Sequence, residues 1–303
     1  MRIVSLLPSA TEILCALGLG EELVGISHRC DFPPEIEGVA VVTRPAGSRL
    51  ASGAAVTRLA SPDDELGPSE LDRAALRAVE PELIIVRDGG SGPGPRQLEA
   101  ALVGLAVSPT IVALGPITLE GIFNSISTLG AMTEAEDEAV ELLEALRQDI
   151  GEIEQGVVAR HDDGLRPVRV VMLEGLSPLV ASGRWVPGQV RRAGGWDLLG
   201  REGEPPSPTT WEAIQEVDPQ MLMFSPAGMT LLEAQAAWRE TEHPEFWHTL
   251  EAVRRGRVFF VEPVYFSRPG PRVVDGVAML AEIFDPDGFV DTSPPDSWTP
   301  LFE

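Results

Sequence analysis

The sequence predicts an α/β protein in which two lobes of alternating strands and helices are joined by one long α-helix. Short apolar segments of strand type alternate with helical segments in both halves of the chain. A stretch of unbroken helical periodicity separates the two series. We place the N-terminal lobe at residues 1–131, the connecting helix at 132–162 and the C-terminal lobe at 163–303.

In the N-terminal lobe, apolar runs without polar alternation indicate strands that are buried on both faces, as in a parallel sheet. The pattern SATE at residues 9–12 is typical of a capping box and predicts a helix that starts at Ser9. Pro81 ends another helix, because proline interrupts the helical hydrogen bonds. We expect strands at 3–7, 23–26, 39–42, 83–86 and 110–114, and helices at 9–18, 69–80, 96–105 and 119–129.

The connecting segment has apolar residues at steps of three and four, with acidic residues between them. These positions are Ala139, Leu142, Leu143, Leu146, Ile150, Ile153 and Val157. A single helix over 134–160 would be roughly 40 Å long at about 1.5 Å per residue. In the C-terminal lobe we expect strands at 168–173, 221–224 and 258–261, helices at 187–193, 209–217 and 272–284, and an extended tail after Asp285.

The sequence contains one internal similarity. VEPELIIV at 79–86 is matched by VDPQMLMF at 217–224, and the two prolines are 138 residues apart. Each segment predicts a helix end, a proline break and a buried strand, and two unrelated corners of this type can look alike. With the long helix between them, duplication of an ancestral lobe is the better interpretation.

The charge of the chain excludes several kinds of function. It has 23 basic and 47 acidic residues, a net charge of −24, and every basic residue is an arginine. The lack of lysine excludes Schiff-base chemistry, a lysine general base and a Walker-type phosphate loop. Because so large a negative charge repels nucleic-acid backbones, we expect no nucleic-acid partner.

The apolar segments are too short for a membrane anchor. None approaches the ~20 apolar residues of a membrane span, and Pro8 interrupts the first run before it reaches the length of a signal peptide. We therefore expect no membrane insertion, and a cytoplasmic location if the chain starts naturally at Met1. Cys15 and Cys30 are too few for a disulfide framework and fit any compartment.

Ligands of open α/β sheets bind beyond the carboxyl ends of the strands, so the residues that follow strands are the candidates for binding. They are Ser9, His28, Arg29, Arg87, Trp185, Tyr265 and Arg268. Ser9 lies at a helix N-terminus, where it either caps the helix or faces a ligand. His28 and Cys30 would share one side of an extended chain and could be metal ligands, but a polar wall or an ordinary turn fits His28 better. We expect no metal site.

The segment YFSRPGPR at 265–272 contains the only tyrosine of the chain. Tyr265 and Arg268 can offer a ring and a guanidinium to a planar or anionic ligand. Tyr265 can equally fill the edge of a lobe, and Trp185 allows the same two interpretations. No nucleophile elbow and no glycine-rich phosphate loop are present, so we expect a protein that is not an enzyme.

Several motifs resemble those of the periplasmic cobalamin-binding proteins of ABC importers, within the family of helical-backbone metal-chelate receptors. They are IVSLLPSATE at 3–12, LVGIS at 23–27, CDFPP at 30–34, PELII at 81–85, ASG at 181–183, AGG at 193–195, DP at 218–219 and the loop 265–272. Together they cover nearly the whole chain. The motifs VTRP at 42–45 and RPGPR at 268–272 are most similar to a branch of this family without an export signal.

The resemblance implies two Rossmann-like lobes in the class III substrate-binding-protein architecture, with a corrinoid, siderophore or haem bound between them. It implies that Arg29, Arg87, Leu179 and Tyr265 face the ligand. In the exported cobalamin binder these positions are aromatic, and here only Tyr265 keeps a ring. The exchange for Arg29 and Arg87 favours a ligand with carboxylate or phosphate groups.

The resemblance also bears on partners. The exported receptors dock on their permease through one glutamate in each lobe, seven residues before the proline that ends a helix. Pro219 places Glu212 there, whereas Pro81 places Ala74 there. Half of the docking pair is missing, which argues against docking on an ABC permease.

We therefore expect non-catalytic binding of a corrinoid (cobalamin-like) or related metal chelate, with no covalent cofactor. The alternative is an ABC-importer receptor for a siderophore, haem or cobalamin whose export signal or lipid anchor is missing from this chain, which would be periplasmic or lipid-anchored. An enzyme that processes corrinoids is a third possibility.

Overall fold

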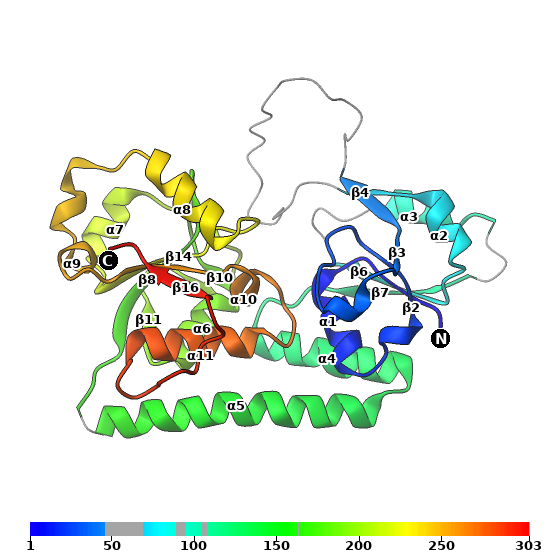
Figure 1. Cartoon of the computed structure of the whole chain (residues 1–303), viewed down its shortest axis with the longest axis horizontal. Helices are drawn as coiled ribbons and strands as arrows, with labels where there is room; N and C mark the ends of the chain where they lie inside the picture. The colour runs from blue at the N-terminus through cyan, green and yellow to red at the C-terminus, as the bar shows by residue number, and fades with distance from the viewer. Residues whose placement is uncertain (46–68, 89–94, 105–107, 163, 303) are drawn as a thin grey trace. The chain divides into compact units, whose positions relative to one another are not determined.

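The computed structural model describes residues 1–45, 69–88, 95–104, 108–162 and 164–302 (Figure 1). The chain divides into two compact units. Unit 1 comprises Met1–Gly115 and Phe123–Leu143, and unit 2 comprises Pro116–Ile122 and Glu144–Glu303. The expected α/β fold with parallel sheets and a long connecting helix is confirmed. The chain passes from one unit to the other after Gly115, after Ile122 and, inside that long helix, after Leu143.

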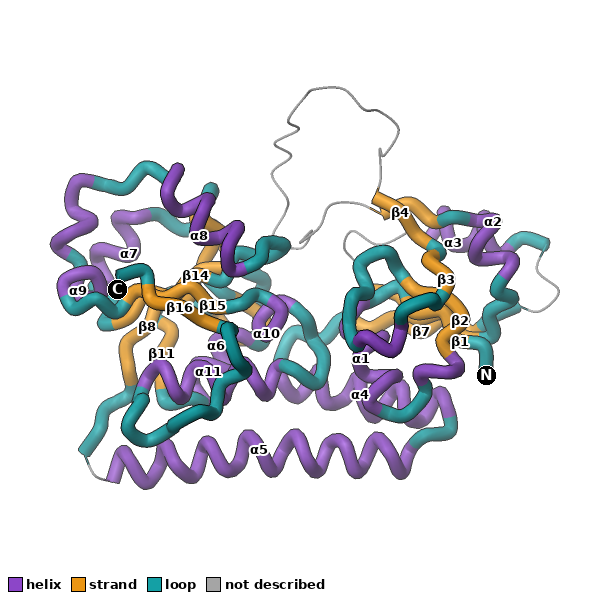
Figure 2. Tube along the Cα trace, in the orientation of Figure 1, coloured by secondary structure: helices purple, strands orange, loops and turns teal. Residues whose placement is uncertain are grey.

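Unit 1 is built on a parallel sheet with the strand order β3-β2-β1-β6-β7. In Figure 2 this sheet lies between α1 and α4 on one side and α2 and α3 on the other. A small antiparallel pair, β4 and β5, accompanies it. The strands are β1 (Ile3–Ser5), β2 (Leu23–Ile26), β3 (Ala40–Val41), β4 (Thr43–Pro45), β5 (Ser69–Leu71), β6 (Leu83–Arg87) and β7 (Thr110–Leu114).

The helices of unit 1 follow the expected order with two differences at their starts. They are α1 (Pro8–Ala16), α2 (Arg73–Ala78), α3 (Pro95–Leu102) and most of α4 (Leu119–Thr133), with the 3-10 turns η1 (Gly20–Glu22) and η2 (Pro34–Ile36). The helix predicted over 69–80 starts only at Arg73. Asp72 caps it, because its carboxylate accepts hydrogen bonds from the backbone N–H groups of Ala74 and Ala75, and the preceding residues pair with β4 instead.

The capping box predicted at 9–12 is wrong. The N-cap of α1 is Leu7, which makes no side-chain cap, and Pro8 occupies the first helical position. Proline suits this position because its fixed φ is helical and its missing N–H has no partner there in any helix. Ser9 is therefore inside the helix.

α5 (Glu136–Asp162) is the long helix expected from the periodicity, and it runs from unit 1 into unit 2 (Figure 1). Five of the seven predicted apolar positions, Ala139, Leu143, Leu146, Ile150 and Ile153, are buried, and Leu142 and Val157 are half-buried. Acidic residues fill its first turn and Arg160 its last turn, which complements the helix dipole at both ends.

Unit 2 has a mixed sheet whose parallel part is β11-β8-β14-β15. This order repeats the order β2-β1-β6-β7 of unit 1. Antiparallel strands extend the sheet on both sides. The strands of this sheet are β8 (Val168–Leu176), β9 (Leu179–Ala181), β11 (Gly195–Asp197), β13 (Ser207–Pro208), β14 (Met221–Phe224), β15 (Val258–Val261) and β16 (Trp298–Pro300). The short strands β10 (Gly183–Arg184) and β12 (Arg201–Glu202) form a separate parallel pair.

The helices of unit 2 cover both faces of this sheet, with α6 and α11 on one side and α7, α8 and α9 on the other (Figure 2). They are α6 (Val186–Arg192), α7 (Trp211–Val217), α8 (Leu231–Glu240), the 3-10 turn η3 (Glu245–Thr249), α9 (Glu251–Arg254), α10 (Val264–Ser267) and α11 (Val273–Phe284). The expected extended tail contains β16. The core under α7 and α8 combines aliphatic side chains with four buried aromatic rings, those of Phe224, Trp238, Trp247 and Phe260.

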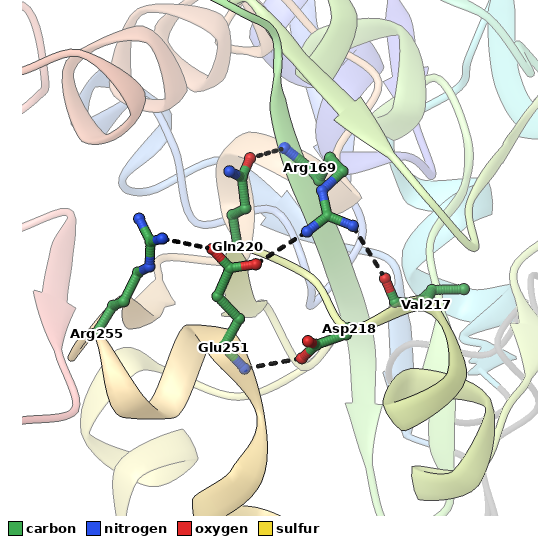
Figure 3. Close-up of polar contacts among 6 residues, drawn as sticks. All are labelled: Arg169, Val217, Asp218, Gln220, Glu251 and Arg255. Carbon is green, nitrogen blue, oxygen red and sulfur yellow. Dashed lines mark hydrogen bonds and ion pairs between the residues drawn. The ribbon is translucent and has the colours of Figure 1, made fainter.

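The two segments of the internal similarity form the same corner in their respective units. Glu80 and Asp218, which precede the two prolines, both have a positive φ, 41° and 40°. In unit 1 the guanidinium of Arg2 donates to the carbonyl oxygen of Val79. In unit 2 the guanidinium of Arg169 donates to that of Val217 (Figure 3). Matched strand order and matched corners both support duplication.

Candidate functional site

The structure brings the candidate residues of unit 1 to one edge of its sheet. Ser9 follows β1, His28 and Arg29 follow β2, and Arg87 is the last residue of β6. These strands are neighbours in the order β2-β1-β6 and run parallel, so their carboxyl ends share an edge. Residues 89–94, shortly after Arg87, lie outside the described residues.

The hydroxyl of Ser9 is available at this edge. Its side chain is 7% exposed, and it makes no hydrogen bond with the described part of the chain. The nearby Thr11 is instead fully buried. Its hydroxyl donates to Ser5 Oγ at 2.9 Å and contacts Cys30 Sγ at 3.1 Å. Thr11 thereby ties the start of α1 to β1 and to the turn after β2.

Residues 27–30 form a turn, in which the N–H of Cys30 donates to the carbonyl of Ser27. The extended chain that would place His28 and Cys30 side by side as metal ligands is therefore absent at this position. No group of three His, Cys, Asp or Glu residues that could hold a metal ion occurs among the residues placed in the structure.

His28 is held by a threonine from the start of β4. Its Nδ1 lies 2.7 Å from Thr43 Oγ1, and its backbone N–H donates to the same oxygen at 3.0 Å. The hydroxyl of Ser27 lies 3.0 Å from Thr43 Oγ1 and is also within 3.4 Å of the N–H of Arg29. One hydroxyl oxygen thus receives three contacts, which fix the ring orientation.

The pKa of His28 is lowered, first by partial burial and second by the positive charge of Arg29. The ring is therefore neutral at pH 7. Arg87 adds a second positive charge to this edge. Arg87 is a half-buried residue, and its guanidinium has no hydrogen bond or ion pair with any residue that the structure describes.

In unit 2 the candidate residues follow β8 and β15, but two of them are enclosed. Leu179 begins β9 and packs in the hydrophobic core with 7% exposure. Trp185 precedes α6 and is 1% exposed, and its indole N–H has no acceptor among the described residues. Both side chains are therefore buried inside unit 2 and are not exposed on its surface.

Tyr265 and Arg268 lie at the short helix α10, where the sequence indicated a loop. Tyr265 is half-buried, and the guanidinium carbon of Arg272 lies 5.9 Å from its ring centre. Burial raises the pKa of the nearby Glu262 carboxyl, while the charges of Arg268 and Arg272 oppose that rise. This end of β15 therefore combines an aromatic ring with two guanidiniums.

Two residues of this arrangement carried no recognisable signal in the sequence. Thr43 reaches His28 only because β2, β3 and β4 bring it there. The buried amide of Gln189 donates to the carbonyls of Tyr265 and Val273, at 2.9 and 2.8 Å, and so fixes α10 against α6 and α11. Both contacts join residues that are distant along the chain, so no local motif could have indicated them.

Glu212 is exposed in the first turn of α7, and Ala74 lies in the first turn of α2. These helices precede the two equivalent corners, so the two residues occupy matching places in their units. In the described segments, no helix has both the length and the apolar character needed to cross a membrane.

Comparison with known sequences gives a consistent result. A family model described as "Periplasmic binding protein" matches residues 3–265. The chain is 22% identical over 291 residues to the uncharacterized ABC transporter substrate-binding lipoprotein YvrC of Bacillus subtilis, covering 95% of this chain and 81% of that protein. It is 25% identical over 275 residues to the vitamin B12-binding protein of Pectobacterium atrosepticum, covering 90% and 84%.

Solved structures share the fold. A periplasmic heme-binding protein from Pseudomonas aeruginosa superposes with a TM-score of 0.71 at 21% identity, over 94% of this chain and 93% of that one. The periplasmic vitamin B12 binding protein BtuF of Vibrio cholerae superposes with a TM-score of 0.66 at 22% identity, over 94% and 96%. The fold of two α/β lobes and one long connecting helix is therefore common to all three chains.

Proposed function

Because the chain belongs to the periplasmic binding protein family, we propose that it binds a corrinoid or a related metal chelate that carries anionic groups. Proteins of this family bind substrates without transforming them, and the protein is accordingly non-catalytic. Relatives named as binders of vitamin B12 and heme support the class of ligand. Within unit 1 we propose Arg29, Arg87 and His28 as ligand-binding residues, and within unit 2 we propose Tyr265 and Arg268.

The proposal rests mainly on the position of Arg87. In a chain with a net charge of −24, its guanidinium lies at the carboxyl edge of the unit 1 sheet and forms no ion pair with a carboxylate of the described residues. A half-buried cation without a counter-ion favours an anionic ligand, because desolvation strengthens the attraction. Carboxylate or phosphate groups on a metal chelate meet this requirement.

The test is direct titration of the purified full chain with cobalamin, cobinamide, haem and a ferric siderophore, followed by absorbance and calorimetry. Saturable binding of at least one chelate at about micromolar Kd or tighter, −8 kcal/mol or so, is the expected result. Failure of all four to bind would contradict the proposal. Free porphyrin and metal salts serve as controls for binding of either part alone.

A second candidate function is that of a receptor for an ABC importer. The exposed Glu212 on α7 and the relative named as an ABC transporter substrate-binding lipoprotein favour it. Cells that lack the gene would be complemented with the wild-type chain, with Glu212→Arg or with Glu240→Arg, an exposed control on α8. Loss of chelate uptake only with Glu212→Arg supports docking, and normal uptake with both variants contradicts it. The cytoplasmic location stays a prediction, which fractionation of the same cells tests.

A further inference from the structure

The hydrogen bonds around Thr43 determine which nitrogen of His28 carries the proton. A threonine hydroxyl donates one hydrogen bond and accepts two. The backbone N–H of His28 occupies one acceptor position of Thr43 Oγ1, at 3.0 Å. The remaining partners are Ser27 Oγ and His28 Nδ1, at 3.0 and 2.7 Å, so one of them must donate to Thr43 and the other must accept from it.

In the first arrangement Ser27 donates to Thr43, and Thr43 donates to Nδ1 of His28. Ser27 Oγ then accepts from the N–H of Arg29. Both hydroxyl protons have acceptors, and every contact is used. Because Nδ1 accepts, the neutral ring carries its proton on Nε2.

In the second arrangement Nδ1–H donates to Thr43, and Thr43 donates to Ser27. The hydroxyl proton of Ser27 then has no acceptor within the described structure, although Ser27 is only 2% exposed. An unmet buried donor disfavours this arrangement by a factor on the order of ten. A doubly protonated ring requires the same arrangement, which agrees with the lowered pKa of His28.

The Nε2 atom is open to a ligand. It makes no hydrogen bond with the residues described, and it is not among the buried polar atoms that lack a partner, so solvent reaches it. The charge of Arg29 is close enough to the ring to influence it. An N–H donor beside a guanidinium suits an acceptor that carries negative charge.

Building on the proposed function, we infer that His28 binds a carboxylate of the chelate through Nε2–H and does not ligate its metal. A metal ligand would need an unprotonated Nε2. This requires the second arrangement, in which the hydroxyl proton of the buried Ser27 has no acceptor. The ligand class is thereby narrowed to chelates with free carboxylates. Neutral amide or ester forms of the same chelates are expected to bind more weakly.

The first experiment measures the tautomer without any ligand. Long-range ¹H–¹⁵N correlation spectra of the uniformly labelled full chain distinguish a ring protonated on Nε2 from one protonated on Nδ1. The chain has only four histidines, and the signals missing from His28→Gln assign His28. Protonation on Nε2 is the expected result. Protonation on Nδ1 at pH 7 would overturn the inference.

The second experiment uses two matched pairs of probes, haem with haem dimethyl ester and dicyanocobyrinic acid with dicyanocobinamide. His28→Asn cannot reach the position of Nε2, whereas His28→Gln places an N–H donor there. We expect His28→Asn to weaken binding of the acids about tenfold or more and of the neutral probes much less, and His28→Gln to retain most of the affinity.

Three outcomes separate the inference from the function on which it rests. Equal losses for acid and neutral probes in His28→Asn would overturn carboxylate recognition while leaving chelate binding intact. If the wild-type complex shows an absorption band of an imidazole-ligated metal and His28→Asn loses that band, His28 ligates the metal instead. Failure of all probes to bind the wild-type chain would contradict the proposed function, and with it the role of His28, whichever tautomer the spectra record.

Discussion

Arg2 and Arg169 hold equivalent corners of the two units through the same contact. Each side chain donates to the carbonyl oxygen of the valine two residues before the proline, Val79 in unit 1 and Val217 in unit 2. Their backbone carbonyls also accept from equivalent N–H groups, those of Glu82 and Gln220, both at 2.8 Å. The two corners differ in one respect that affects stability.

Among the residues that the structure describes, only the corner of unit 2 pairs the guanidinium of its arginine with a carboxylate, because Glu82 in unit 1 accepts from the backbone N–H of Arg2. Arg169 lies 2.9 Å from Glu251, whose side chain is 13% exposed and also pairs with Arg255 (Figure 3). The N–H of Glu251 in turn donates to the carboxylate of Asp218 at 2.8 Å. The network connects the end of α7, the start of α9 and the start of β8.

We expect Arg169→Met to lower the free energy of unfolding of unit 2 by about 1–3 kcal/mol, because the largely buried carboxylate of Glu251 loses one partner. The double variant Arg169→Met with Glu251→Gln should recover part of this loss. All six tryptophans lie in unit 2, so fluorescence during urea unfolding reports that unit.

Arg2→Met is the matched control, since it removes the equivalent contact in unit 1. It should leave the fluorescence transition in place and change only the far-ultraviolet circular dichroism. An equal shift of the fluorescence transition by both variants would contradict this assignment of Arg169.

Asp197 provides a prediction about pH. Burial raises the pKa of its carboxyl above the ordinary 3.8, although Ser182 and the N–H groups of Leu199 and Gly200 oppose the rise. A raised pKa stabilises the fold fully below the unfolded value, and this contribution is lost as the pH rises through the folded value. Asp197→Asn removes that dependence and keeps an acceptor for both N–H groups.

The stability of Asp197→Asn relative to the wild-type chain should therefore increase as the pH rises from about 4 toward 7. Asp197→Ala serves as the comparison. It should be less stable than Asp197→Asn by about 1–3 kcal/mol at every pH, because the two backbone N–H groups lose their acceptor. Urea unfolding at several pH values measures both. A difference between Asn and wild type that does not vary with pH would contradict the raised pKa.

The sequence was enough to predict those helices and strands whose ends are marked by proline or glycine. The strands at 23–26, 110–114, 221–224 and 258–261 have the expected limits, because each is an apolar run with turn residues or a proline break beside it. The long helix α5 follows directly from its apolar spacing. These features depend on neighbouring residues only.

Contacts between distant residues account for what the sequence did not predict. The pairing of 69–71 with β4 shortens the helix predicted at 69–80. His28 was identified as a candidate, but its orientation depends on Thr43, fifteen residues later. Trp185 and Leu179 follow strands as binding residues do, yet the packing of unit 2 encloses them. Burial of this kind is decided by tertiary structure and has no local signature.

Gly183 and Gly151 form a pair that tests packing around β10. A Cβ on Gly183 would lie 2.4 Å from the backbone N of Pro206 and 2.6 Å from the carbonyl oxygen of Glu204. Gly183→Ala should therefore destabilise unit 2 by about 1–3 kcal/mol. Gly151 lies in α5, and apart from the backbone of its own helix and its chain neighbours no described atom is within 4 Å of the position that a Cβ would take there. Gly151→Ala should therefore stabilise the helix by about 0.5–1 kcal/mol.

Urea unfolding followed by tryptophan fluorescence measures both glycine variants. Their shifts should have opposite signs. A stable Gly183→Ala chain would mean that the segment 204–206 is placed differently from this structure.

The last prediction concerns the cation at the edge of the unit 1 sheet. Arg87→Gln should raise the Kd for an acidic probe such as haem about tenfold or more, because it removes a charge-assisted hydrogen bond from a half-buried site. The affinity of the variant should also depend less on salt, since screening acts on the charge that has been removed.

Arg147→Gln is the control with the same change of charge. Arg147 is exposed on α5, where it pairs with Glu120 at 3.0 Å, and an exposed pair of this kind contributes little. Calorimetric titration at two salt concentrations compares the three chains. Equal weakening by both variants would mean that net charge governs binding, and that Arg87 makes no specific contact.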